Sequence, residues 1–144
     1  MITIALMAHD KRKELMVQFC INHCRTLAKH KIFATAVTGK VVREATGLNV
    51  EKLMARSNGG SQQIASMIAN NEVDFVIYFR DTAHSGNDSD DDSNLLRICD
   101  VHNIPAATNI ATADIIIRAL EMGEFEFKDV YGLSLRKNSE YYTE

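Results

Sequence analysis

The sequence predicts an α/β fold, a Rossmann-like three-layer αβα arrangement around a central, mostly parallel β-sheet. Short, nearly unbroken apolar runs such as residues 2–8 and 74–79 are typical of strands buried on both faces of a parallel sheet. Segments with apolar residues three and four positions apart, typical of amphipathic helices, alternate with these runs. Strands that alternate with helices favour right-handed crossovers and a parallel sheet covered on both faces.

The individual elements follow from the same patterns. Apolar runs predict strands over residues 2–8, 31–35, 74–79, 104–107 and, last, 125–133. Helical spacing predicts helices over residues 11–30, 41–45, 61–70, 95–101 and 112–122. Ser61 directly follows Gly59-Gly60 and is expected to be the N-cap of its helix. Residues 80–93 contain five Asp and are predicted to form a polar, solvated loop.

Length and composition indicate one globular domain. The chain has 144 residues, of which 46% are hydrophobic and 24% charged. We expect a single domain over residues 1–135 and a polar tail over 136–144. The net charge of −3, without a basic stripe, argues against a nucleic-acid polymer as partner. With no transmembrane run and no signal-peptide pattern, the expected location is the cytoplasm, without a membrane partner.

Three cysteines, Cys20, Cys24 and Cys99, are an odd number, which fits free thiols in a reducing compartment. Cys20 and Cys24 lie four residues apart with His23 between them. As metal ligands they need at least one further partner, so packing along a helix is the favoured interpretation. No metal and no organic cofactor is predicted.

The acidic loop has a partial likeness to a calcium-binding loop. Asp88, Asp90 and Asp92 match the first three ligand positions. Ser93 stands where glycine is needed, however, and Cys99 stands where the bidentate glutamate is needed. We therefore expect a solvated loop and not a calcium site.

Polar residues gather where the predicted strands end, which is where open parallel sheets bind ligands. Taken singly, each has an ordinary explanation as a turn, cap or solvated residue. Together, hydroxyls, amides, a lysine and a histidine at one sheet edge predict a site for a phosphate-sized anion. The candidate residues are His9, Lys13, Thr35, Thr38, Gly39, Gly59, Gly60 and Asn109.

With these residues assembled, the chain resembles the methylglyoxal synthase family from residue 4 to about 119. The matching motifs are Ala8-His9-Asp10 with Lys13, Ala34-Thr35 through Thr38-Gly39, residues 45–50, Gly59-Gly60 with Gln62-Gln63, and residues 105–114. The resemblance implies a homohexamer that converts dihydroxyacetone phosphate into methylglyoxal and inorganic phosphate without a cofactor. It also implies that an aspartate removes a proton next to the carbonyl group and that a histidine assists.

The chain departs from the family pattern where the chemistry is done. The position of the catalytic aspartate holds Ser61, whose hydroxyl is too weak a base to replace a carboxylate. The position of the assisting histidine holds Asp88, with His84 four residues earlier. Arg56 adds a planar guanidinium that can hold phosphate, and Ser61 joins the candidate binding residues by position.

Two functions follow as hypotheses. In the first, the protein binds a phosphate-bearing small molecule or nucleotide without efficient catalysis, in a sequestering or sensing role. In the second, it is an active methylglyoxal synthase, a carbon–oxygen lyase, with Asp10 or Asp91 as the base. A structural protein without a ligand is the third class, disfavoured because it has no need for His9, Lys13 and Thr38 together.

Overall fold

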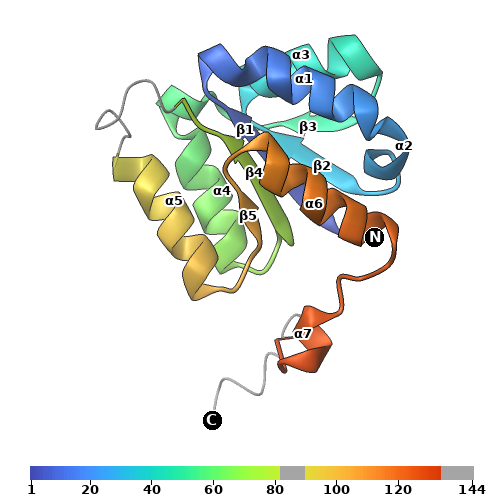
Figure 1. Ribbon diagram of the computed structural model, residues 1–144. Helices are drawn as coiled ribbons and strands as arrows, with labels where there is room; N and C mark the ends of the chain where they lie inside the picture. Colours follow the sequence, from blue (N-terminus) through green and yellow to red (C-terminus); the bar gives the residue numbers. More distant parts are fainter. Residues whose placement is uncertain (82–89, 134–144) are drawn as a thin grey trace.

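Five parallel strands form one sheet in the order β3-β2-β1-β4-β5 (Figure 1). The computed structural model describes residues 1–81 and 90–133. The strands are β1 (Thr3–Ala8), β2 (Lys31–Ala34), β3 (Val50–Lys52), β4 (Phe75–Phe79) and β5 (Ala106–Ala107). The predicted three-layer α/β fold with a parallel central sheet is confirmed, and β3 is a strand that the sequence did not predict.

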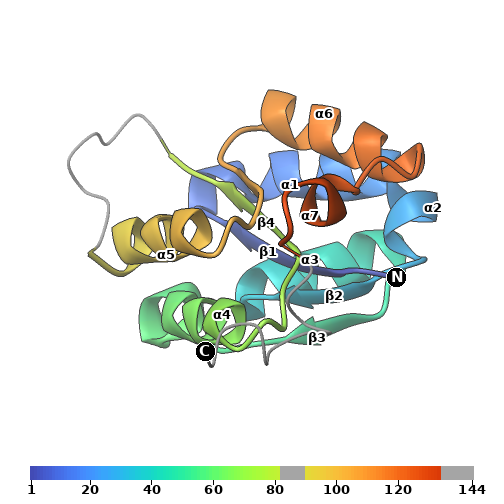
Figure 2. The same ribbon diagram turned by 90° about the horizontal axis from the view of Figure 1, so that it is seen from below.

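Helices cover both faces of this sheet. Figure 2 shows α1 (Lys13–Asn22) and α6 (Ile110–Glu121) on one side, with α4 (Gly60–Ala69) and α5 (Asp90–Val101) on the other. The remaining elements are η1 (Asp10–Arg12), α2 (Cys24–Leu27), α3 (Ala36–Thr46), η2 (Arg56–Asn58) and α7 (Phe127–Val130). The single helix predicted over residues 11–30 is interrupted, because His23 takes a non-helical backbone conformation between α1 and α2.

Each central strand contributes side chains to two separate cores. Along β1, Ile4, Leu6 and Ala8 pack in the core beneath α1, α3 and α6. Ala5 and Met7 point the other way, into the core beneath α4 and α5. A strand buried on both faces needs apolar residues at nearly every position, which explains why the sequence pattern of β1 is an unbroken apolar run.

His23 connects the α1–α2 junction to α6. Its Nε2 lies 3.0 Å from Asp114 Oδ1 and its Nδ1 lies 3.2 Å from Glu121 Oε1. The pKa of Asp114 is lowered, first by the hydrogen bond from Arg118 and then by that from His23. The pKa of Glu121 is lowered by hydrogen bonds from Thr26 and His23. The ionised forms of both carboxyl groups are therefore favoured in the folded protein.

Residues 125–133 are not a strand, so this prediction was wrong. Phe125, in the segment before α7, packs on both the sheet and the helical turn, with its ring centroid 6.1 Å from Phe75 in β4 and 5.5 Å from Phe127 in α7. Lys128 Nζ, in α7, lies 2.6 Å from the buried Asp74 carboxylate. The polar tail predicted over 136–144 lies outside the described residues.

All three cysteines are free thiols. Burial raises the pKa of Cys20 and of Cys99 to about 12, so both stay protonated at neutral pH. Cys24 is partly exposed, and its Sγ lies 3.9 Å from the Thr46 carbonyl oxygen. Across residues 1–81 and 90–133, no helix has the length and apolar character needed to cross a membrane.

Candidate functional site

The strand order reverses between β1 and β4, and His9 and Asp81 lie at the carboxyl ends of these two strands. In open α/β sheets this reversal point is where ligands bind, because the connections on either side diverge and leave a crevice. His9 Nδ1 lies 3.7 Å from Asp81 Oδ2, and the Asp81 side chain is almost fully buried. The His9 N–H also donates to the Phe79 carbonyl oxygen at 3.0 Å, which ties the end of β1 to that of β4.

Lys13 brings a positive charge to the same point. Its ammonium donates to the Ala8 carbonyl oxygen at 3.0 Å and to Asp10 Oδ1 at 2.9 Å. The hydrogen bond and charge of Lys13 lower the pKa of Asp10, and the charges of His9 and Arg56 add to this effect. The charge of Arg56 in η2 therefore acts on η1, so Lys13 and Arg56 both contribute positive charge to this edge of the sheet.

Two buried threonines follow β2. Thr35 directly precedes α3 and is 2% exposed, and Thr38 in the first turn of α3 is 1% exposed. Within the part of the chain that the structure describes, Thr38 Oγ1 has no hydrogen-bond partner. A buried hydroxyl without a partner is unfavourable, so Thr38 is suited to bind an oxygen atom of a ligand.

Gly59 and Gly60 allow α4 to approach the end of β2 closely. Gly59 has a φ of 99° in the left-handed region, which favours glycine. A Cβ on Gly60 would lie 2.5 Å from the Met54 carbonyl oxygen and 2.8 Å from Thr35 Cγ2. The Gly60 N–H donates to the Ala55 carbonyl oxygen at 2.9 Å, so this amide already has a partner within the protein.

Gly39 and Asn109 have structural roles at the same edge. The Gly39 N–H donates to the Thr35 carbonyl oxygen at 2.8 Å within α3. Asn109 is the N-cap of α6, where its Oδ1 accepts from the Thr112 N–H at 3.0 Å and faces the Thr112 hydroxyl at 3.2 Å. Ligand binding by Gly39 and Asn109 stays a prediction.

A buried carboxylate, Asp92, lies at the centre of a hydrogen-bonded cluster behind these residues. Its side chain is 3% exposed. Ser61 donates to Asp92 Oδ1 at 3.0 Å, and Oδ2 accepts from Tyr78 OH at 2.8 Å and from Arg56 Nη1 at 3.2 Å. Burial and the hydrogen bond to Asp92 raise the pKa of Tyr78 to about 12, so the phenol remains a donor at neutral pH. The cluster joins η2, α4, β4 and α5.

This cluster corrects two predictions. Ser61 is not an N-cap, because Gly59 takes that position and the Ser61 hydroxyl turns inward to Asp92. Asp92 is not part of a solvated loop, because α5 begins at Asp90 and buries it. The spacing of Asp92, Leu95 and Cys99, all buried, is the helical signal that could have revealed its orientation.

Other predicted candidates are not placed by the structure. His84 and Asp88 lie outside the described residues, as does the side chain of Asp91. Among the described residues, no group of three or more His, Cys, Asp or Glu side chains is arranged to hold a metal ion. The described site contains carboxylates, hydroxyls, an imidazole and the cations of Lys13 and Arg56.

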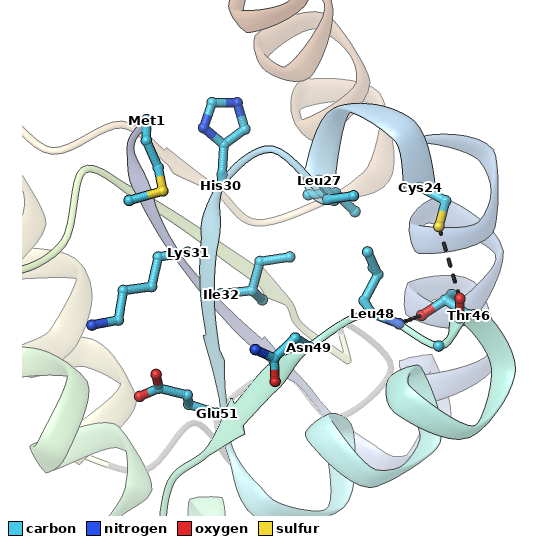
Figure 3. A pocket seen from close by; sticks show the side chains of 12 residues that line it. Met1, Cys24, Leu27, His30, Lys31, Ile32, Thr46, Leu48, Asn49 and Glu51 are labelled. Atoms are coloured by element: carbon cyan, nitrogen blue, oxygen red, sulfur yellow. Dashed lines mark hydrogen bonds between the residues drawn. The ribbon is translucent and has the colours of Figure 1, made fainter.

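The opposite end of the sheet carries a hollow of about 600 Å³, shown in Figure 3. It lies where β2 and β3 begin, between His30, Thr46 and Glu51. His30 Nδ1 accepts from the Ile2 N–H at 3.0 Å, and burial lowers the pKa of the imidazole. None of the candidate site residues lines this hollow, so its size does not make it the functional site.

Comparisons with known proteins show which family the sequence matches. Residues 16–108 match the MGS-like domain family. The chain is 50% identical over 135 residues to a methylglyoxal synthase of Caldicellulosiruptor saccharolyticus, covering 94% of this chain and 96% of the relative. It is 46% identical over 127 residues to a methylglyoxal synthase of Bacillus subtilis, covering 88% and 93%.

The fold also matches a solved structure. The crystal structure of methylglyoxal synthase from Elizabethkingia anophelis aligns with a TM-score of 0.74 and 39% identity, covering 81% of this chain and 76% of that one. At this identity, the similarity extends beyond a shared α/β architecture to the sequence itself. The site at the β1–β4 boundary therefore belongs to a scaffold that its relatives share.

Proposed function

This chain belongs to the MGS-like domain family, and on that premise we propose that it is a methylglyoxal synthase, a lyase that acts on dihydroxyacetone phosphate. The observation that carries the proposal is the 50% identity, over 94% of the chain, to a relative with this activity in its name. Lys13 and Arg56, together with the buried hydroxyl of Thr38 in the helix that follows β2, support it, because they suit the phosphate group of such a substrate.

The reaction divides into two steps that place definite demands on the site. A base first removes a proton from the hydroxymethyl carbon next to the ketone. The electron pair of the C–H bond forms a carbon–carbon double bond, and the ketone oxygen gains a proton. The hydroxyl on the former hydroxymethyl carbon of this enediol then gives its proton to a base and becomes an aldehyde. The electron pair of the carbon–carbon double bond shifts to the neighbouring carbon–carbon bond, the carbon–oxygen bond to phosphate breaks, and phosphate leaves with the electron pair of that bond. The remaining enol rearranges to methylglyoxal.

Candidate residues for phosphate stabilisation and for polarisation of the ketone oxygen are present among the described residues. Lys13 and Arg56 stabilise the charge of the leaving phosphate, and Thr38 donates a hydrogen bond to it. His9, held against Asp81, is placed to polarise the ketone oxygen and to carry the proton that this oxygen gains. No metal ion or organic cofactor is part of the proposal.

A second candidate function is binding without efficient catalysis. It is favoured by Ser61, because the resemblance to the family implies a catalytic aspartate at this position and a serine hydroxyl is too weak a base to replace it. Such a protein would hold a phosphate-bearing metabolite or nucleotide and sequester it or report its concentration. It would keep the cations and hydroxyls of the site and lack proton transfer.

Release of methylglyoxal and inorganic phosphate from dihydroxyacetone phosphate distinguishes the two functions. The synthase is expected to turn over within about tenfold of the enzyme median of about 10 per second, with both products formed in equal amounts. Calorimetric titration with inorganic phosphate on the same preparation measures binding. Clear binding without turnover would refute the synthase and support the second function.

We further propose a homo-oligomer, a hexamer by family resemblance, that works in the cytoplasm. Val37 and Met54, beside the site, are 51% and 53% exposed, and another copy of the chain would cover them. Three free thiols suit a reducing compartment. Light scattering is expected to give six times the 16.1 kDa mass of one chain, and a monomer at micromolar concentration would refute the assembly.

A further inference from the structure

Asp92 places a carboxylate on the buried face of α5, where the stability of the fold does not require a charged side chain. Burying a carboxylate is unfavourable, and apolar side chains of similar volume are often more stable than a buried ion pair. Its neighbours on the buried face of α5, Leu95 and Cys99, are apolar. The carboxylate is nevertheless held by three donors from three other elements: Ser61, Tyr78 and Arg56. A group so placed calls for a functional explanation.

We propose that Asp92 is the general base of this chain and removes the proton from the substrate carbon. The inference rests on the proposed function and assigns the base that its first step requires. Asp92 Oδ1 lies 3.0 Å from the hydroxyl of Ser61, so the carboxylate from α5 stands one hydrogen bond from the side chain at position 61. Serine is shorter than aspartate, and the carboxylate lost from α4 is supplied by the facing helix.

The surroundings of Asp92 suit this role. Arg56 balances the negative charge, and Tyr78 and Ser61 fix the orientation of the two carboxylate oxygens. In the reaction, Asp92 Oδ1 forms the new O–H bond as the C–H bond of the substrate breaks. The proton is then returned to the ketone oxygen of the substrate through His9, which restores the carboxylate for the next turnover.

The other described carboxylates at this edge are less suitable. The Asp10 side chain is 85% exposed and paired with Lys13, so it lies in solvent and not next to Ser61. Asp81 lies against His9 and is placed to orient the imidazole. Asp92 alone of these three carboxylates lies next to Ser61.

The first test replaces the carboxylate with a group of the same shape. Asp92→Asn is expected to lower kcat by about 10²–10⁴-fold, which is the usual contribution of a general base. The exchange of the substrate C–H for deuterium in D₂O, followed by NMR, should fall in parallel. Calorimetric affinity for inorganic phosphate should change by less than about threefold, because phosphate does not require a base. Asp100→Asn, on an exposed position of the same helix, is the matched control.

A second test moves the carboxylate between helices. Asp92→Val is expected to be inactive, and Ser61→Asp combined with Asp92→Val is expected to regain at least tenfold over Asp92→Val alone. Ser61→Asp in the natural background places two carboxylates within hydrogen-bond distance, and their repulsion should make it less active than the double variant. A double variant no more active than Asp92→Val would contradict the inference.

A third test uses the unaltered protein and so does not depend on the folding of a variant. Chloroacetol phosphate carries the phosphate and ketone of the substrate next to a carbon–chlorine bond. A carboxylate that faces this carbon displaces chloride and forms an ester, which peptide mass spectrometry locates. Esterification at Asp92 is expected, and esterification at Asp10, Asp81 or Asp91 in its place would overturn the assignment.

The outcomes separate the two proposals. Absence of turnover by the unaltered protein overturns the proposed function and the role of Asp92 with it. Turnover that persists within tenfold in Asp92→Asn overturns the role of Asp92 alone. Loss of turnover in Asp92→Asn together with loss of phosphate binding and a much lower melting temperature indicates a structural residue, and also overturns it.

Discussion

Replacement of Gly60 by alanine is expected to force α4 away from the end of β2. The added Cβ would lie 2.5 Å from the Met54 carbonyl oxygen, 2.8 Å from Thr35 Cγ2 and 2.9 Å from the Ala55 carbonyl oxygen. Real Cβ atoms do not approach other atoms this closely. Two of the three neighbours are backbone atoms that cannot rotate away, so the helix or the preceding loop must move.

The size of the effect follows from the number of close contacts and the length of the chain. Overpacking of this kind lowers the free energy of unfolding by about 1–3 kcal/mol. With an unfolding entropy of about 2.1 cal/mol/K per residue, 144 residues correspond to about 3 °C of melting temperature for each kcal/mol. Gly60→Ala is therefore expected to melt about 3–10 °C below the unaltered protein.

Gly39→Ala is the matched control, because it adds the same atom within a neighbouring helix. There the Cβ would lie 2.8 Å from Lys52 Cγ, in a flexible side chain that can move aside. Alanine inside a helix is favoured over glycine by up to about 1 kcal/mol, which offsets part of this close contact, so Gly39→Ala should lose less stability than Gly60→Ala. Calorimetry and urea titration measure both variants. A melting temperature of Gly60→Ala within 1 °C of the unaltered protein would refute the close approach.

Three further predictions concern single groups. Thr38→Val removes a buried hydroxyl without a partner, so stability should stay equal or rise by up to about 1 kcal/mol while calorimetric affinity for inorganic phosphate falls; a loss of stability would contradict the assignment. The lowered pKa values of Asp114 and Glu121 stabilise the folded state above about pH 4. This stabilisation is lost as the pH falls through the lower folded-state values, so the melting temperature should drop less on acidification when both are replaced by their amides. With a disulfide reagent at neutral pH, Cys24 should react in the folded protein and the two buried cysteines only after unfolding.

The strands at the centre of the sheet could be predicted because burial on both faces leaves a strong sequence signal. β1 and β4 are apolar at nearly every position, and the structure places both near the predicted bounds. β3 has only three residues, of which Val50 alone is buried, so no period can be recognised. The alternation in residues 125–133 has the period of a strand, but here it comes from Phe125 in an irregular segment packing on Phe127 at the start of α7.

The positions of the candidate binding residues could be predicted from topology, whereas the burial of Asp92 could not be predicted from composition. His9, Lys13 and Thr38 follow strand ends, and parallel strands bring such positions together regardless of the side chains involved. Asp92 follows several other polar and acidic residues, so its segment has the composition of a solvated loop. Its burial depends on the packing of α5 against α4, a contact between distant parts of the chain.

The two faces of the sheet carry different parts of the proposed chemistry, and this division has a consequence for how the protein can evolve. Lys13 and Thr38 lie on helices of one face, while Ser61 and Asp92 lie on helices of the other, above a separate apolar core. Arg56, which we assign to the phosphate, also donates to Asp92 and links the two parts. Apart from this link, proton transfer and phosphate affinity could be adjusted through mutations in different layers. If Asp92 is the base, a reactive group absent from one helix is supplied by its neighbour in the same layer, and a changed motif then does not by itself mark an inactive family member.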